Sequence, residues 1–290
     1  MKLLRNLLKS PMFVIGAGLF FGTILLALLA PLFVDLSTYN DTVGGAFMPA
    51  GDGYLLGTDH LGRDYVKLLL KGLQSSLYVG FTAGIIATTV GTLLGIYGGF
   101  KGGIIDDILN MATNLFIVIP SFVVLILISA SVSGSDISDP AWYQTRSLTL
   151  IAVIIGGTTW TWSARAVRAQ AAALKSRDHI SLARINGDGT LAILVKHILP
   201  YLLSYVFMVF ILQIASGILS ESAISMIGLG PLDTQSLGII LNDAKANGAL
   251  GDGVWWAFIP STVLITLIVF ALYLINTSME GVFNPRLRRE

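Results

Sequence analysis

Cysteine is absent from the 290 residues of the chain, and charged side chains are few. The absence of Cys excludes disulfides, thiolate metal sites and cysteine nucleophiles. Charged residues make up 12% of the chain, whereas a soluble domain usually devotes about 25% of its residues to charge. Hydrophobic residues make up 54%, and the 31 glycines suit membrane helices whose backbones pack closely. The composition therefore predicts a membrane protein rather than a soluble domain.

Six apolar stretches are long enough to cross a bilayer, which takes about 20 helical residues because lipid offers backbone amides no partner. They are Phe13–Val34, Leu77–Tyr97, Ile108–Val132, Leu148–Trp162, Ile198–Leu219 and Val254–Ile275. The expected fold class is therefore all-α, a polytopic membrane protein with six transmembrane helices. The first stretch is expected to be a retained anchor rather than a signal peptide, because its apolar run exceeds the usual core of about 7–15 residues.

The distribution of Lys and Arg predicts how the chain is oriented, because these residues resist translocation and stay in the cytoplasm. With the N-terminus inside, the inner segments hold thirteen basic and six acidic residues, a net charge of +7. The outer segments hold five basic and eleven acidic residues, a net charge of −6. The sequence thus predicts a multi-pass protein of the cytoplasmic (inner) membrane with both termini in the cytoplasm.

The sequence contains no motif for an ion-coupling, nucleotide or metal site. An ion-coupled carrier holds ionisable groups in mid-membrane, yet Glu221 and Glu280 are expected just past the ends of the fifth and sixth spans. No G-x-x-x-x-G-K-[ST] motif offers a nucleotide site, and His60, His179 and His197 lack the spacing of metal ligands. We expect no catalytic residue, metal or cofactor. If the protein moves a solute uphill, the energy must therefore come from another chain. A secondary carrier and a membrane-embedded enzyme are the disfavoured alternatives.

The loop between the fourth and fifth predicted spans, Ser163 to His197, is long for a simple connection and carries six basic side chains. Its Ala-rich first part predicts that the fourth span continues beyond the membrane as a basic helix. Asp178 is expected to cap a second helix, His179–Asn186, and Gly187 is expected to end it. A third short helix is predicted over Thr190–His197. This pattern favours a surface that receives another protein, with an amphipathic hairpin on the lipid surface as the alternative.

The residues of this loop resemble the loop signature of ABC-transporter permeases. Ser181-Leu182-Ala183 matches an E-A-A triplet, Gly187 matches the glycine that follows it, and His197-Ile198-Leu199-Pro200 matches a closing H-I-L-P. The resemblance implies coupling helices that sit in a cleft of an ATPase subunit. Ser181 stands where glutamate is common in that family. The implied coupling residues are Ser181, Leu182, Ala183, Arg184, Ile185, Gly187, His197 and Pro200.

Three further stretches, Leu56 to Gly80, Glu221 to Pro231 and Asn284 to Arg288, resemble the dipeptide, oligopeptide and nickel permease family. The resemblance is to the subunit with a long first outer loop, and it implies the type I ABC-importer permease fold. Residues 1–76 would form the N-terminal segment, first span and outer loop, with 77–290 as the permease core and 163–197 as its coupling loop. The implied partners are a second homologous permease, two ATPase subunits, an extracytoplasmic solute-binding protein and the lipid bilayer, without nucleic acid. Peptides are the expected solutes, and nickel or oligosaccharides are the alternatives.

Two more segments are candidates for a role in transport. Gly62 to Leu73 predicts a short amphipathic helix along the outer surface, with Arg63, Lys67 and Lys71 on one face. Such a helix would either dock a receptor or brace the spans. The run of small residues from Glu221 to Gly230 predicts a segment that dips back into the protein, which membranes tolerate where it is buried or lines a cavity. The candidate gate or pathway residues are Glu221, Ser222, Gly228, Gly230, Gln213 and Ser216. For Gln213 and Ser216, hydrogen bonds between helices are an equally good interpretation.

Overall fold

A computed structural model of the chain describes residues 7–51, 53–133 and 147–283. Helices are the regular elements throughout these ranges, and their β pairing is limited to isolated bridges among residues 42–64. The expected all-α class is therefore confirmed. The motif from Asn284 to Arg288 falls outside the described residues, as do some of the charged residues counted for orientation, among them Lys2, Arg5 and Arg146.

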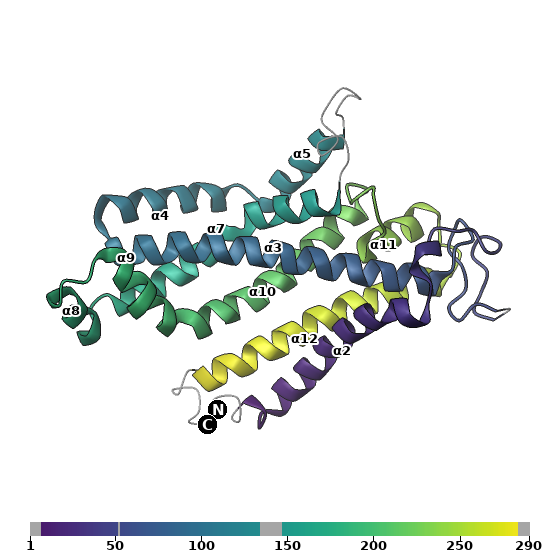
Figure 1. The fold of residues 1–290 in the computed structure, drawn as a ribbon. Coiled ribbons are helices and arrows are strands. Elements are labelled where there is room, and N and C mark those ends of the chain that lie inside the picture. The colour runs from purple at the N-terminus through teal and green to yellow at the C-terminus, as the bar shows by residue number, and fades with distance from the viewer. Residues whose placement is uncertain (1–6, 52, 134–146, 284–290) are drawn as a thin grey trace.

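Long helices that run side by side form the body of the molecule (Figure 1). The helices are α2 (Pro11–Phe33), α3 (Tyr65–Lys101), α4 (Gly103–Val118), α5 (Ser121–Ser133), α7 (Leu148–Leu174), α8 (Asp178–Ile185), α9 (Thr190–Ile193), α10 (Leu199–Met226), α11 (Leu237–Ala246) and α12 (Ile259–Phe283). A π-helical turn, Leu194–Ile198, joins α9 to α10, and short 3₁₀ turns occur at Leu36–Thr38 and Trp255–Ala257. α3 packs against both α7 and α10, and α2 pairs with α12 on one flank.

Four of the described helical segments are long and apolar enough to cross a membrane, or five if a bent pair counts as one span. They contain α2, α3, α10 and α12, and the bent pair is α4 with α5. The fourth expected span lies in α7, which is less apolar because Thr, Trp and Arg follow its first three turns. The count of six spans therefore stays a prediction.

The third expected span, Ile108–Val132, is wrong as a single helix. The chain bends by 74° between α4 and α5. Pro120 lies in this break, where it has no N–H to donate and keeps the residue before it out of the helical region. Ile119 accordingly adopts extended backbone, with φ −79° and ψ 120°. The break gives this part of the membrane domain two helical segments of different direction.

The separate outer helix expected over Gly62 to Leu73 is also wrong. One unbroken helix, α3, begins at Tyr65 and runs for 37 residues, which corresponds to about 55 Å at 1.5 Å per residue. The Asp64 side chain caps it by accepting hydrogen bonds from the backbone N–H groups of Val66 and Lys67. The expected domain boundary at 76/77 thus falls within a continuous helix, because nothing between the outer turn and the span interrupts the backbone hydrogen bonds.

A stripe of glycines on α3 allows α7 to approach it closely. Gly91, Gly95 and Gly99 are spaced four residues apart, so they share one face of the helix. A Cβ atom added to Gly95 would lie 2.6 Å from the backbone oxygen of Ala164, and one added to Gly99 would meet the backbone oxygen of Arg168. Small residues at this spacing permit backbone-to-backbone packing between membrane helices. The close contact between α3 and α7 therefore depends on the absence of side chains at these three glycines.

We expect Gly95→Ala to destabilise the protein by about 1–3 kcal/mol, because the methyl group has no room between two backbones. Gly22→Ala is the matched control, since a Cβ added at Gly22 on α2 meets nothing within 4 Å. Thermal unfolding of the detergent-solubilised protein measures both. Equal melting temperatures for the two variants would contradict close packing at this seam.

Candidate functional site

The loop between α7 and α10 folds as a compact set of short helices at one end of the molecule (Figure 1). α7 runs without a break to Leu174, which confirms the predicted extension of the fourth stretch as a helix. The second helix, α8, begins at Asp178, so Asp178 is its first residue and not the expected cap. A carboxylate in the first turn still favours the helix, because the N-terminal end of the helix dipole is positive.

Gly187 ends α8 as the sequence predicts. Its backbone has φ +85°, a left-handed conformation that residues with a Cβ atom rarely adopt. The N–H of Gly187 donates to the backbone oxygen of Arg184, and the N–H of Asp188 donates to that of Ala183. These two bonds form a Schellman motif, which reverses the chain immediately after the helix.

The α8 helix has one buried and one exposed side. Ile180 and Ala183 are buried in a cluster with apolar side chains of α3, α7 and α10, among them Phe100 and Val167. Ala183, one of the implied coupling residues, is therefore not accessible, because it packs α8 onto this cluster. Of the other expected coupling residues, Ser181, Leu182, Arg184, Ile185, Gly187 and Pro200 are exposed and His197 is partly buried.

The exposed side of α8 is apolar as well as polar. Leu182 is 59% exposed and Ile185 is 80% exposed, and Leu191 on α9 is 74% exposed. Large apolar side chains gathered beside a polar rim are typical of a surface that another protein covers. The α8 helix is therefore anchored on one side through Ile180 and Ala183 and presents large apolar side chains on the other.

Next to α8 lies a basic hollow of about 420 Å³, which the sequence did not predict. The Arg184 guanidinium lies over the Phe100 ring, 5.0 Å from its centroid, and the Lys175 Nζ donates to the backbone oxygen of Lys101. The hollow is lined by Phe100, Lys101, Lys175, Arg184, Asp188, Thr190 and Ile193. Folding brings these residues together from the ends of α3 and α7, which are 74 residues apart in sequence at Lys101 and Lys175.

A cavity of about 530 Å³, here called the pathway cavity, lies between the α4–α5 break, α7, α10 and α12. It is lined by Phe116, Ile117, Ile119, Ser121, Thr158, Thr159, Thr161, Trp162, Arg165, Leu212, Gln213, Ser216 and Tyr273. The structure thus brings together Gln213 and Ser216, two of the predicted pathway residues. The Gln213 side-chain nitrogen donates to the Thr159 backbone oxygen, at 3.0 Å, and to the Ser163 hydroxyl, so it also links α10 to α7.

Sequence reasoning missed Arg165 as a residue of this cavity and assigned it only to the basic helix of the loop. Its Nη2 atom donates to the Asn114 side-chain oxygen of α4 at 2.7 Å. Thr158, Trp162 and Arg165 follow one another at intervals of four and three residues, so they share a face of α7. That spacing was the signal in the sequence that could have found Arg165.

Glu221 lies inside α10 and is completely buried, so the expectation of a water-accessible carboxylate beyond the fifth span is wrong. The helix continues to Met226 because nothing before Gly228 breaks it. The hydroxyls of Ser76 on α3 and Ser225 on α10 donate to the Glu221 carboxylate at 3.1 and 2.6 Å. Ser76 in turn accepts the backbone N–H of Leu237, the first residue of α11. Glu221 thus joins three helices through serine hydroxyls.

The other predicted gate residues surround the end of α10. Ser222 is buried near α11, where a Cβ atom added to Gly238 would meet its backbone. Gly228 has φ +84° and ends the helix with a second Schellman motif, in which Gly228 and Leu229 donate to Ser225 and Ile224. Gly230 lies against Ser225 without room for a side chain. The chain then returns as α11, which packs on α3 and α10.

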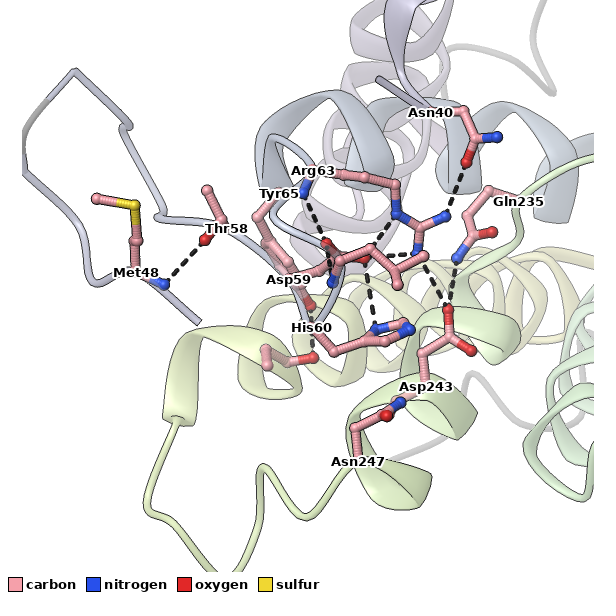
Figure 2. A network of polar contacts seen from close by, with 12 residues as sticks. Asn40, Met48, Thr58, Asp59, His60, Arg63, Tyr65, Gln235, Asp243 and Asn247 are labelled. Carbon is pink, nitrogen blue, oxygen red and sulfur yellow. Dashed lines mark hydrogen bonds and ion pairs between the residues drawn. The ribbon is translucent and has the colours of Figure 1, made fainter. Parts of the chain in front are cut away.

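A buried polar network fixes the outer loop to α11 (Figure 2). The Arg63 guanidinium donates to Asp59, at 2.7 Å from Nε to Oδ2, to Asn40 at 2.9 Å and to Asp243 at 3.4 Å. Arg63 is only 6% exposed, so it does not lie on the free basic face that the sequence predicted. Asp59 and Asp243 thus both accept hydrogen bonds from Arg63. Within residues 7–51, 53–133 and 147–283, no group of three side chains that could bind a metal ion occurs.

The two lysines expected on that same face are also engaged with the outer loop. The Lys67 Nζ donates to the Thr38 hydroxyl at 2.6 Å, and the Lys71 Nζ lies 5.7 Å from the centroid of the Tyr39 ring. Three basic side chains therefore hold the loop of residues 35–64 against the start of α3.

These features define a class of protein: a multi-pass helical membrane component with a half-open cavity of mixed polar and apolar lining, and with a short exposed helix, α8, packed on its long helices. Residues 91–289 match the family described as "Binding-protein-dependent transport system inner membrane component". The chain belongs to this family. It is a transmembrane permease subunit of an ABC importer and resides in the inner membrane.

Several relatives align with nearly the whole chain. A Brucella abortus protein named as a peptide transport system permease is 28% identical over 287 residues, which cover 99% of this chain and 92% of the relative. The oligopeptide transport system permease protein OppC of Lactococcus lactis is 27% identical over 285 residues, which cover 97% and 93%. OppC of Mycobacterium tuberculosis is 28% identical over 238 residues, which cover 81% and 77%.

We expect Arg63→Met to destabilise the protein by about 3 kcal/mol, because it leaves the buried carboxylate of Asp59 without its cationic partner. Lys245→Met is the control, since Lys245 is an exposed residue of the neighbouring α11. Chemical denaturation of the solubilised protein compares the two free energies of unfolding. A cost for Arg63→Met no larger than that for Lys245→Met would mean that the network does not hold the outer loop.

Proposed function

We propose that this permease forms half of a pathway for peptides and works by alternating access. A second, homologous permease chain would supply the other half, with two ATPase subunits and an extracytoplasmic solute-binding protein completing the importer. The observation that carries the proposal is the pathway cavity, which offers hydroxyl and amide groups between α7 and α10. The names of relatives aligned over more than nine-tenths of this chain support peptides as the solute.

The coupling role is assigned to the exposed side of α8 and the turn that follows it. ATP-driven closure of the two ATPase subunits would push on Leu182, Ile185 and Gly187, while the buried Ile180 and Ala183 pass the push to the membrane helices. Ser181, Arg184, His197 and Pro200 would complete the contact or its support. His197 lies 3.2 Å from the Asp188 carboxylate, which braces the turn. Because α7 is one helix from the cavity to Leu174, motion at its end reaches Thr158 and Trp162 directly.

The gating role is assigned to the end of α10, from Glu221 to Gly230. Ser222, Gly228 and Gly230 lie where α10 turns into the segment that leads to α11, and Glu221 links both helices to α3 through Ser76. Opening the pathway would require these hydrogen bonds to be exchanged. A buried carboxylate held only by hydroxyls suits such an exchange, since hydroxyls can rotate to new partners.

The cytoplasm is assigned to the end of the molecule that carries α8 and α9. The described start of α2 and end of α12 lie toward that same end (Figure 1), and the charge distribution of the sequence favours it. Both termini would then be cytoplasmic, and the Arg63 network would face outward. The family match to residues 91–289 supports residues 77–290 as the permease core.

Uptake by the reconstituted importer tests the function. Proteoliposomes with both permeases, both ATPases and the binding protein should accumulate a labelled tripeptide when ATP is present, and should not do so without this chain. Nickel and an oligosaccharide are the comparison solutes. Accumulation of either in place of the tripeptide would assign the pathway to that solute, and uptake by this chain alone with an ion gradient would contradict the role of the ATPases.

We expect Gly187→Val to uncouple ATP hydrolysis from uptake, because a β-branched residue at φ +85° costs about 1–3 kcal/mol and distorts the docking turn. Gly189→Val is the control, since Gly189 has an extended backbone and no atom near its missing Cβ. The ratio of peptide imported to ATP hydrolysed is measured for both variants. An unchanged ratio in Gly187→Val, with normal assembly of the ATPase subunits, would remove the coupling role of this turn.

A further inference from the structure

Arg165 is the one charged side chain among the described residues that line the pathway cavity. We propose that its guanidinium binds the terminal carboxylate of a peptide in the cavity. This inference rests on the proposed function, since it names the group of the solute that the cavity recognises.

The guanidinium of Arg165 has a neutral partner and, among the residues that the structure describes, no ion-pair partner. Within the described part of the chain it donates one hydrogen bond, to the Asn114 side-chain oxygen at 2.7 Å. Arg168, one turn further along α7, is held by two bonds to the Asp106 carboxylate instead. A guanidinium carries five N–H donors in a planar fork that fits a carboxylate, and one bond to Asn114 leaves most of them unused. The two arginines therefore differ in kind: Arg168 fastens α7 to α4, while Arg165 keeps its charge available at the cavity.

The other end of the cavity wall accepts hydrogen bonds. The Thr158 hydroxyl donates to backbone oxygens of its own helix at 3.0 Å, and the Thr159 hydroxyl donates to that of Ile155 at 2.9 Å. Since each hydroxyl has one hydrogen, both present only lone pairs to a solute. These oxygens suit the amide N–H groups and the ammonium group of a peptide.

The spacing of the two ends fits a short peptide. Thr158 and Arg165 are seven residues apart on α7, which is about 10 Å along the helix at 1.5 Å per residue. An extended chain covers about 3.3–3.6 Å per residue, so about three residues span this distance. Trp162 lies between these two residues on α7, and Phe116 of α4 also lines the cavity, so apolar rings flank the path. The hydrogen-bond acceptors at Thr158 and the positive charge at Arg165 therefore match the amino end and the carboxylate end of a tripeptide bound along α7.

Uptake by the complete reconstituted importer tests the assignment. The probes are trialanine, trialanine amide and the amide of Ala-Glu-Ala, and the affinity of the binding protein for each is measured so that uptake is compared at equal occupancy. We expect Arg165→Gln to lower uptake of trialanine about tenfold or more and to leave uptake of trialanine amide unchanged, because a charge-assisted hydrogen bond contributes that much. Arg165→Lys keeps the charge and should retain part of the uptake. Lys9→Gln, an exposed residue outside the cavity, is the control.

Chemical rescue provides a second measurement that does not depend on the amide probes. This chain has no native cysteine, so Arg165→Cys introduces its one thiol. Modification with aminoethyl methanethiosulfonate, which adds an ammonium group, should restore trialanine uptake, and neutral methyl methanethiosulfonate should not. Restoration by both reagents would overturn the proposal.

The outcomes separate this inference from the proposed function. Selective loss of trialanine uptake supports recognition of the terminal carboxylate, and loss of Ala-Glu-Ala amide as well would extend the site to side-chain carboxylates. Equal loss of all three probes, or no loss of any, would overturn the role of Arg165 while peptide transport by the unmodified importer stands. Failure of the unmodified importer to take up any peptide would instead overturn the proposed function, and this inference with it.

Discussion

The close contact of α3 with α7 is the interaction on which the rest of the structure depends. Gly91, Gly95 and Gly99 let the two backbones meet, and membrane helices have no hydrophobic driving force to bring them together otherwise. α7 carries the polar wall of the pathway cavity in one half and leads into α8 from the other. Ile180 and Ala183 of α8 are buried in the cluster that holds Phe100 of α3. The α8 helix, the glycine contact between α3 and α7, and the α7 wall of the cavity are therefore parts of one packed unit.

The same helix, α3, organises the outer end of the molecule. Its first turn follows Arg63, which holds the outer loop to α11, and one face two to three turns further on carries Ser76, which reaches Glu221 on α10 and the first residue of α11. A single helix of 37 residues thus touches the proposed coupling end and the proposed gate. The α4–α5 break at Pro120 supplies the opposite wall of the cavity with a bend rather than a straight span. A movement of α3 with α7 would therefore change the positions of both the proposed coupling end and the proposed gate.

The sequence predicted the helical class, most of the apolar spans and the helix–turn–helix of the loop, because these follow from local composition and from glycine at Gly187. The sequence did not predict the surroundings of residues whose contacts come from other helices. Glu221 looked exposed because hydropathy ends the fifth stretch before it, yet hydroxyls of Ser76 on α3 and of Ser225 on its own helix hold it in the interior. The burial of Ala183 was not predicted, because the side chains that cover it belong to other helices, α3 and α7. Arg165 looked like one more basic residue of a cytoplasmic helix, since its partner Asn114 lies on α4, 51 residues earlier in the sequence.

Distances between spin labels in the assembled importer test most directly whether α3, α7 and α8 move as one unit. Because this chain has no cysteine, labels can be placed on Ser181→Cys in α8 and on Leu93→Cys, an exposed position of α3, with a second pair formed by Ser181→Cys and Leu28→Cys in α2. On binding of ATP, the Ser181–Leu93 distance should stay constant while the Ser181–Leu28 distance changes. A shift in the Ser181–Leu93 distance would mean that α8 moves separately from α3, which would contradict the movement of α3, α7 and α8 as one unit.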